Sequence, residues 1–125
     1  MLANKNAMAT VAVKNLDNAR AFYGTTLGLT PTGSESSEVA LYRSGSATIV
    51  VYRSEFAGTN KATSVTWSVG DELDTIIAAL KRAGVSFEHY DMAGGKRDGD
   101  VHVFGDFRGA WFKDPDGNIL HINNG

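Results

Sequence analysis

Residues 111–122 read Trp-Phe-Lys-Asp-Pro-Asp-Gly-Asn-Ile-Leu-His-Ile, and this stretch decides the fold. It places two short apolar runs on either side of a turn. Asp114 can accept a hydrogen bond from the turn's own backbone, and Pro115 sets φ for the position that follows. Gly117 supplies the left-handed conformation that closes the reversal. The stretch therefore predicts a β-hairpin.

His121 lies in the returning strand of this hairpin. Alternation puts it on the same face as Ile119 and opposite Leu120 and Ile122. Three interpretations stay open for it: a hydrogen-bonding contact to a ligand, a strand histidine satisfied within the protein, or a metal ligand. Which of them holds decides the chemistry of the protein.

Composition limits the choice of function. The 125 residues suit a single domain, 1–125, and 42% apolar and 21% charged residues are typical of a globular protein. A net charge of −2 gives no reason to expect nucleic acid or an anionic membrane as partner. Apolar runs fall short of the ~20 residues that span a bilayer, and the first residues lack a signal-peptide core. The lack of cysteine fits the cytoplasm, and any metal site must use His, Asp, Glu or water.

The chain repeats one order of elements twice. The first module, about 7–56, predicts a strand over 10–13, a helix over 17–27 that ends at Gly28, and strands over 39–42 and 47–52, with room for another at 29–32. The second module, about 62–125, predicts a strand over 64–69 and a helix that Asp71 caps and Gly84 ends. Further strands are expected at 85–90, 101–104, 109–113 and 119–122. A period near fifty residues, present in two copies, indicates an internal duplication.

Two sequence signatures, together with this duplication, indicate a resemblance to a known family. The first is Val13-Lys14-Asn15-Leu16-Asp17, then Ala21-Phe22-Tyr23, then Leu27-Gly28-Leu29; the second is the run from Trp111 to Asn118. With the repeated order, they resemble the vicinal oxygen chelate superfamily of glyoxalases, bleomycin-resistance proteins, fosfomycin-modifying enzymes and extradiol dioxygenases. The resemblance implies an α+β fold in which two βαβββ modules form curved mixed sheets around a cleft, usually in a homodimer.

The resemblance also implies a divalent metal held by two or three His or Glu side chains. The corresponding positions here are Met8, seven residues before Asn15, Ser64, seven before Asp71, and His121. A thioether and a hydroxyl are poor ligands for such cations, which prefer imidazole or carboxylate. His102 and His89 could in principle rebuild a site with His121. The pattern favours a metal-free protein without a cofactor.

Aromatic and charged residues complete the candidate site. Aromatic walls with a few polar groups hold flat organic ligands, and we assign Trp111 to the cleft and Trp67 to the core. Arg108 could pair with an acidic group of a ligand. The stretch 94–100 has glycines beside two adjacent cations, but it lacks the strand-to-helix context of a phosphate loop, so we interpret it as a surface loop. The candidate ligand-binding residues are His121, Trp111, Arg108, Ser64, Thr66, Met8 and Tyr52.

Three functions follow from these residues. The first is a metal-free protein of the bleomycin-resistance type that sequesters an aromatic or peptide-like small molecule as a cytoplasmic homodimer. The second is a lyase, isomerase or dioxygenase that uses a divalent metal such as Zn, Ni, Mn or Fe as a Lewis acid, with His121 as one ligand. The third is a dimeric structural or regulatory module without a ligand.

Overall fold

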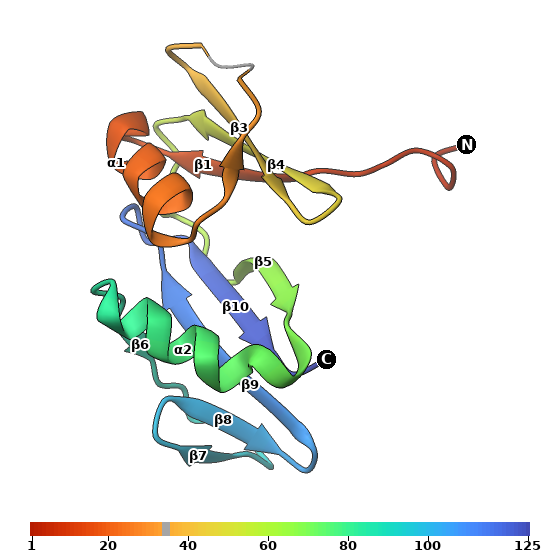
Figure 1. Ribbon diagram of the computed structural model, residues 1–125, viewed down its shortest axis with the longest axis vertical. Helices are drawn as coiled ribbons and strands as arrows, with labels where there is room; N and C mark the ends of the chain where they lie inside the picture. Colours follow the sequence, from red (N-terminus) through yellow and green to blue (C-terminus); the bar gives the residue numbers. More distant parts are fainter. Residues whose placement is uncertain (34–35) are drawn as a thin grey trace. The chain divides into compact units, whose positions relative to one another are not determined.

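The computed structural model describes residues 1–33 and 36–125 and has two mixed β-sheets, one of four strands and one of six, with few helices (Figure 1). The chain divides into unit 1, Met1–Gly58, and unit 2, Thr59–Gly125. Each unit contains one sheet and one α-helix, which confirms the predicted α+β fold of two βαβββ modules.

Unit 1 places its first strand beside its last. The sheet order is β1-β4-β3-β2, with β1 parallel to β4 and the other pairs antiparallel. The parallel pair needs a crossover, which the helical segment supplies. The elements are β1 (Ala9–Val13), α1 (Leu16–Arg20), a π-helical turn η1 (Ala21–Thr26), β2 (Thr30–Pro31), β3 (Val39–Ser44) and β4 (Ala47–Arg53).

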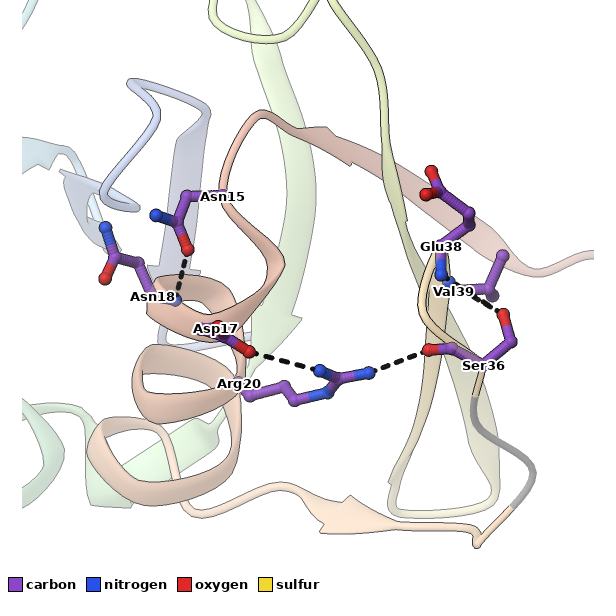
Figure 2. Close-up of polar contacts among 7 residues, drawn as sticks. All are labelled: Asn15, Asp17, Asn18, Arg20, Ser36, Glu38 and Val39. Carbon is purple, nitrogen blue, oxygen red and sulfur yellow. Dashed lines mark hydrogen bonds and ion pairs between the residues drawn. The ribbon is translucent and has the colours of Figure 1, made fainter.

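The side chain of Asn15 caps the start of α1. The Asn15 side chain accepts a hydrogen bond from the Asn18 N–H at 2.9 Å, which satisfies one of the free donors of the first turn (Figure 2). Arg20 then joins the helix to the segment before β3, since it bonds both Asp17 at 3.3 Å and the Ser36 carbonyl at 2.8 Å. Asparagine thus serves as the cap, and the helix begins one residue before the predicted Asp17.

The predicted helix over 17–27 is α-helical only as far as Arg20. From Ala21 the turns widen, and the Leu27 N–H bonds the Phe22 carbonyl five residues back at 2.8 Å. Gly24 lies in this turn, where a Cβ would stand 3.6 Å from the ring of Tyr42 on β3. The segment ends at Gly28, whose φ of 70° is the left-handed conformation that was predicted for the helix end.

Unit 2 repeats this topology and adds strands to it. The order β5-β10-β9-β8 corresponds to β1-β4-β3-β2, with β5 parallel to β10, and β7 extends the sheet beyond β8 while β6 pairs with β9. The elements are β5 (Thr63–Ser68), a 3₁₀ turn η2 (Gly70–Glu72), α2 (Leu73–Arg82), β6 (Phe87–Glu88), β7 (Lys96–Asp98), β8 (Val101–Phe104), β9 (Phe107–Lys113) and β10 (Ile119–Asn123).

Three local predictions in unit 2 were wrong. Asp71 does not cap α2, because it lies inside η2 and the α-helix begins at Leu73 without a side-chain cap. The strand expected over 85–90 is only the two residues of β6. The stretch 94–100, interpreted as a loop, contains β7, because its backbone pairs with β8.

Helix α2 lies along one face of the sheet of unit 2 (Figure 1). Its Leu73, Ile77 and Leu80 are buried, and burial of each such side chain contributes about 1.5–3 kcal/mol. Within the described ranges, none of the helices has the length and apolarity of a membrane-spanning segment.

The closing hairpin forms as its sequence predicts. One oxygen of Asp114, which is 5% exposed, accepts the N–H groups of Asp116 at 3.0 Å and Asn118 at 2.9 Å. Its other oxygen accepts the Asn118 side-chain amide at 2.8 Å, and Gly117 has a φ of 89°. A buried carboxylate with this many donors holds the turn rigid, and so sets the register in which β10 returns along β9.

Candidate functional site

The candidate site lies on the face of the unit 2 sheet that is turned away from α2. The register of β10 places His121 directly opposite Trp111 on β9 and Thr66 on β5. Directly paired residues project to the same face, so all three share it. On the next strand, His102 is opposite Gly109, two residues from Trp111. We call this surface the distal face of unit 2.

Six rings on or beside this face form a continuous aromatic cluster. Trp111 stacks on His121 with the ring centroids 4.1 Å apart and the planes 20° apart. Phe107 covers His121 at 6.0 Å, and the edge-to-face pair of His102 and Trp111 has its centroids 5.0 Å apart. Each such pair contributes about 0.5–1.5 kcal/mol beyond burial. The members of the aromatic cluster are Tyr90, His102, Phe104, Phe107, Trp111 and His121.

Both ring nitrogens of His121 are hydrogen-bonded inside the protein. Nδ1 lies 3.0 Å from the Ala110 carbonyl oxygen, so it carries the proton and donates. Nε2 lies 3.2 Å from the Asn123 side-chain amide, which donates to it. The Gly125 N–H bonds the oxygen of the same amide at 2.9 Å, and this fixes which way the amide points. His121 is therefore a neutral imidazole.

Burial keeps His121 neutral. The side chain is 6% exposed, and loss of hydration lowers its pKa below the usual value. The hydrogen bond to the Ala110 carbonyl opposes this shift, and the nearby His102 adds to it. The second of the three interpretations, a strand histidine satisfied within the protein, describes this geometry.

Gly109 makes room for the His121 ring. A Cβ at position 109 would lie 2.6 Å from Cε1 of His121 and 3.1 Å from Cε1 of Phe107, both closer than carbon atoms pack. This glycine was not among the predicted site residues. The available signal was a glycine inside an otherwise apolar strand, which often marks the close approach of another group.

The strand β5 contributes a hydroxyl, that of Thr63, which was not among the predicted site residues either. The indole N–H of Trp111 donates to Oγ1 of Thr63 at 3.2 Å, which fixes the orientation of the ring. The predicted Ser64 lies next to it, but the pairing with β10 passes from Thr63 to Val65, so Ser64 is the extra residue of a β-bulge. Alternation counted along the sequence could not reveal this shift.

Arg108 lies on the opposite face from His121. It is three positions from Trp111 along β9, and its guanidinium forms two bonds with the Asp74 carboxylate of α2, at 3.1 and 3.2 Å. This pair joins the helix to the sheet. The structure thus gives Arg108 an internal acidic partner and places it away from the aromatic cluster.

Met8 and Tyr52 belong to unit 1. Met8 directly precedes β1 and is 56% exposed, and Tyr52 on β4 is 37% exposed. Tyr52 pairs with Ala12 and alternates with the buried Val51, so it projects from the face of its sheet that does not form the core of unit 1.

The side chains of the described residues do not fit the metal that the fold implies. In the ranges 1–33 and 36–125, no three side chains of His, Asp or Glu gather so as to hold an ion. The Nε2 lone pair of His121 is occupied by the Asn123 amide, and Nε2 of His102 accepts the Tyr90 N–H at 2.9 Å. His89 bonds Asp100 at 2.8 Å, so it does not complete a site with the other two histidines.

Solved structures show the same fold with little sequence identity. An integron cassette protein from the mobile metagenome of the Halifax Harbour sewage outfall superposes with a TM-score of 0.70 at 19% identity, over 96% of this chain and 97% of that one. A variant of the fosfomycin resistance protein FosX from Listeria monocytogenes, bound to Mn(II) and 1S,2S-dihydroxypropylphosphonic acid, gives 0.72 at 18%, over 100% and 92%. Lactoylglutathione lyase from Agrobacterium tumefaciens gives 0.71 at 14%, over 98% and 95%.

Sequence comparison identifies the family directly. No curated protein sequence matches this chain significantly. Residues 6–122, nearly the whole chain, match the Glyoxalase/Bleomycin resistance protein/Dioxygenase superfamily. This match agrees with the duplicated topology and with the resemblance carried by the two sequence signatures, and so the chain belongs to that superfamily.

Proposed function

We propose that this protein binds a small aromatic molecule on the distal face of unit 2 without the help of a metal ion. The observation that carries the proposal is the Trp111–His121 stack, in which both nitrogens of the histidine are already bonded within the protein. A histidine in that state serves to position the indole beside it. Trp111 is then the residue that contacts the ligand.

The geometry of Trp111 supports recognition by stacking. The ring is half-buried, its N–H is held by Thr63, and one face is covered by His121. An aromatic surface fixed before the ligand arrives loses little side-chain entropy on binding, and this raises affinity. Thr66, directly opposite His121, is exposed and adds a hydroxyl to the same face.

The donor set supports a metal-free site. A lone imidazole, with its free lone pair already accepting a hydrogen bond, gives a divalent cation neither the ligands nor the geometry it needs. Met8 and Ser64, which the family resemblance places at the other ligand positions, offer a thioether and a hydroxyl.

Metal content is the first test. Protein purified without chelator or affinity metal, analysed by inductively coupled plasma mass spectrometry, is expected to carry far less than one divalent ion per chain. A stoichiometric ion that disappears in the His121→Ala variant would refute the proposal. It would favour the alternative, a lyase or dioxygenase with a divalent metal, for which the Mn(II) bound to the similar FosX structure is the precedent.

Ligand binding is the second test. A panel of aromatic compounds is screened by thermal shift, and hits are titrated against tryptophan fluorescence in a Trp67→Phe background, where Trp111 is the only indole. We expect binding to quench Trp111, and the Trp111→Ala variant to lose the thermal shift while Trp67→Phe keeps it. A hit that is unaffected by Trp111→Ala would place the ligand elsewhere.

We also propose that the protein works as a cytoplasmic homodimer. The lack of cysteine suits a reducing compartment, and the family resemblance implies a homodimer. Light scattering at micromolar concentration is expected to give twice the mass of one chain. A monomeric protein that still binds the ligand would show that the dimer is not needed for binding and would refute this part of the proposal.

A further inference from the structure

A pocket of about 340 Å³ lies at the β7–β8 edge of unit 2 and adjoins the aromatic cluster. Tyr90, His102 and Phe104 belong to both the pocket lining and the cluster. The ring of His102 is 5.0 Å and that of Tyr90 6.0 Å from the ring of Trp111. A ligand held in this pocket therefore contacts rings that themselves pack on the indole.

The charged residues around the pocket favour an anion. Lys96 and Arg97 line it from β7, against a single carboxylate, Asp91. Arg97 is directly opposite His102 in the register, so both project to the same face. The guanidinium bonds the Gly99 carbonyl at 3.5 Å, the outer limit for a hydrogen bond, and Lys96 has no ion-pair partner among the described residues.

Two lining residues also carry buried polar atoms that lack a partner. His102 is 2% exposed, and its Nε2 accepts the Tyr90 N–H, so the proton of the neutral ring is on Nδ1. That Nδ1 is unpaired within the described part of the chain, as is the hydroxyl of Tyr90. Unpaired buried donors are costly, and a ligand oxygen that reached one would remove the cost.

The hydroxyl of Tyr90 is protonated near neutral pH, and burial moves its pKa further from that range. Loss of hydration raises the pKa of Tyr90, Glu88 raises it further and Lys113 lowers it. The Tyr90 hydroxyl is thus a donor, as Nδ1 of His102 is from its hydrogen-bond pattern. Together with two cations, they form a set that suits an acceptor with a negative charge.

We propose that this pocket takes the acid group of the ligand, and that the ligand is a small aromatic carboxylate. The inference rests on the proposed binding function and names its ligand class. Arg97 and Lys96 neutralise the carboxylate, and the attached ring lies against Phe104 and Tyr90, whose cluster includes Trp111. The volume is at the small end for ligand pockets, so it suits a one- or two-ring acid better than the larger peptide-like compounds.

The test compares 2-naphthoate with 2-naphthamide, which have the same shape and differ in charge. Both are titrated by calorimetry and by Trp111 fluorescence in the Trp67→Phe protein. We expect the acid to bind about tenfold or more tightly than the amide, the size of one charge-assisted hydrogen bond. Replacing Lys96 and Arg97 together by Gln should abolish this preference, and Arg82→Gln, an exposed cation of α2 outside the pocket, should keep it.

A second readout reports on His102 without altering it. In long-range ¹H–¹⁵N spectra, the free protein should show His102 protonated on Nδ1, and 2-naphthoate should shift that proton downfield while the amide does not. Equal binding of acid and amide, with Trp111 quenched by both, would overturn this inference and leave the binding function standing. Failure of every aromatic compound to bind would overturn both.

Discussion

Gly109→Ala is the substitution that tests the site most directly. It adds one methyl group on the distal face of unit 2, at 2.6 Å from Cε1 of His121. Carbon atoms pack best at about 3.5–4.0 Å, so the ring or the strand must move by about 1 Å. The ring is held by the Ala110 carbonyl at 3.0 Å and by the Trp111 stack, and neither contact survives such a shift intact.

The magnitude follows from the contacts that the shift breaks. Lengthening the Nδ1 bond by about 1 Å removes it, at about 1 kcal/mol. Disturbing the stack on Trp111 costs about 1 kcal/mol more, and overpacking adds a similar amount. Replacing a strand glycine returns about 0.5–1 kcal/mol. We expect Gly109→Ala to lower the free energy of unfolding by about 2 kcal/mol.

The assay is urea unfolding at 25 °C, followed by far-UV circular dichroism. The matched control is Gly24→Ala in η1, where the new Cβ would be 3.6 Å from Tyr42, an ordinary contact. That variant is expected to be neutral or slightly stabilised. The tryptophan fluorescence should also change in Gly109→Ala, because the indole loses its partner.

A double-mutant cycle shows whether His121 causes the penalty. In a His121→Ala background only the 3.1 Å approach to Phe107 remains, so Gly109→Ala should cost clearly less than in the parent protein, giving a coupling energy of about 1–2 kcal/mol. An equal penalty in both backgrounds would refute the close approach of ring and strand as the cause. A loss below about 0.5 kcal/mol in the parent protein would do the same.

Three further outcomes are expected. Burial lowers the pKa of His121 in the folded protein, so the unfolded state binds the proton first as the pH falls. The free energy of unfolding should therefore be constant above about pH 6.5 and decrease below it, by at most about 1.4 kcal/mol per pH unit. The free energy of unfolding of His121→Gln should lack this pH dependence. A variant with the same pH profile as the parent protein would contradict the assignment to His121. Asp114→Ala removes three hydrogen bonds within a buried turn and should cost about 2–4 kcal/mol in urea unfolding, whereas a cost under 1 kcal/mol would mean that the turn holds without them. Arg108→Ala breaks a partly exposed pair with Asp74, should cost less than about 1 kcal/mol, and should leave ligand affinity unchanged by calorimetry; lost affinity would return Arg108 to the site.

Much of the fold could be predicted because its signals are local. The Asp-Pro-Asp-Gly-Asn turn specifies its own hydrogen bonds, and Gly28 marks the end of the first helical segment through its left-handed backbone. The strand in which His121 was predicted also forms, as β10, Ile119–Asn123. These features depend on residues within a few positions of each other.

The errors arise where distant residues decide the outcome. The widened turn at η1 goes with the packing of Tyr42 against Gly24, and at the start of η2 the Gly70 N–H bonds the distant Gly125 carbonyl at 3.0 Å. The polar stretch at 96–98 becomes a strand only because β8 pairs with it. Local composition does not contain this information.

The sequence predicted two of the central residues of the candidate site, but not the contacts that hold them. Trp111 and His121 are adjacent on one face, but the partners that define their state, Thr63, Asn123 and Gly109, were not singled out. Their importance comes from the register between strands and from a bulge at Ser64. A pattern within one strand cannot specify the register between two.

The hydrogen bond from Asn123 to Nε2 of His121 has an evolutionary consequence. A single side chain occupies the lone pair that would otherwise face outward from the ring, so one substitution at position 123 releases it. Descendants of this sequence could therefore gain a coordinating imidazole before any change in the backbone or in the stack on Trp111. One imidazole does not make a metal site, so further ligands would have to follow, and Asn123 is the position at which to look for the first change.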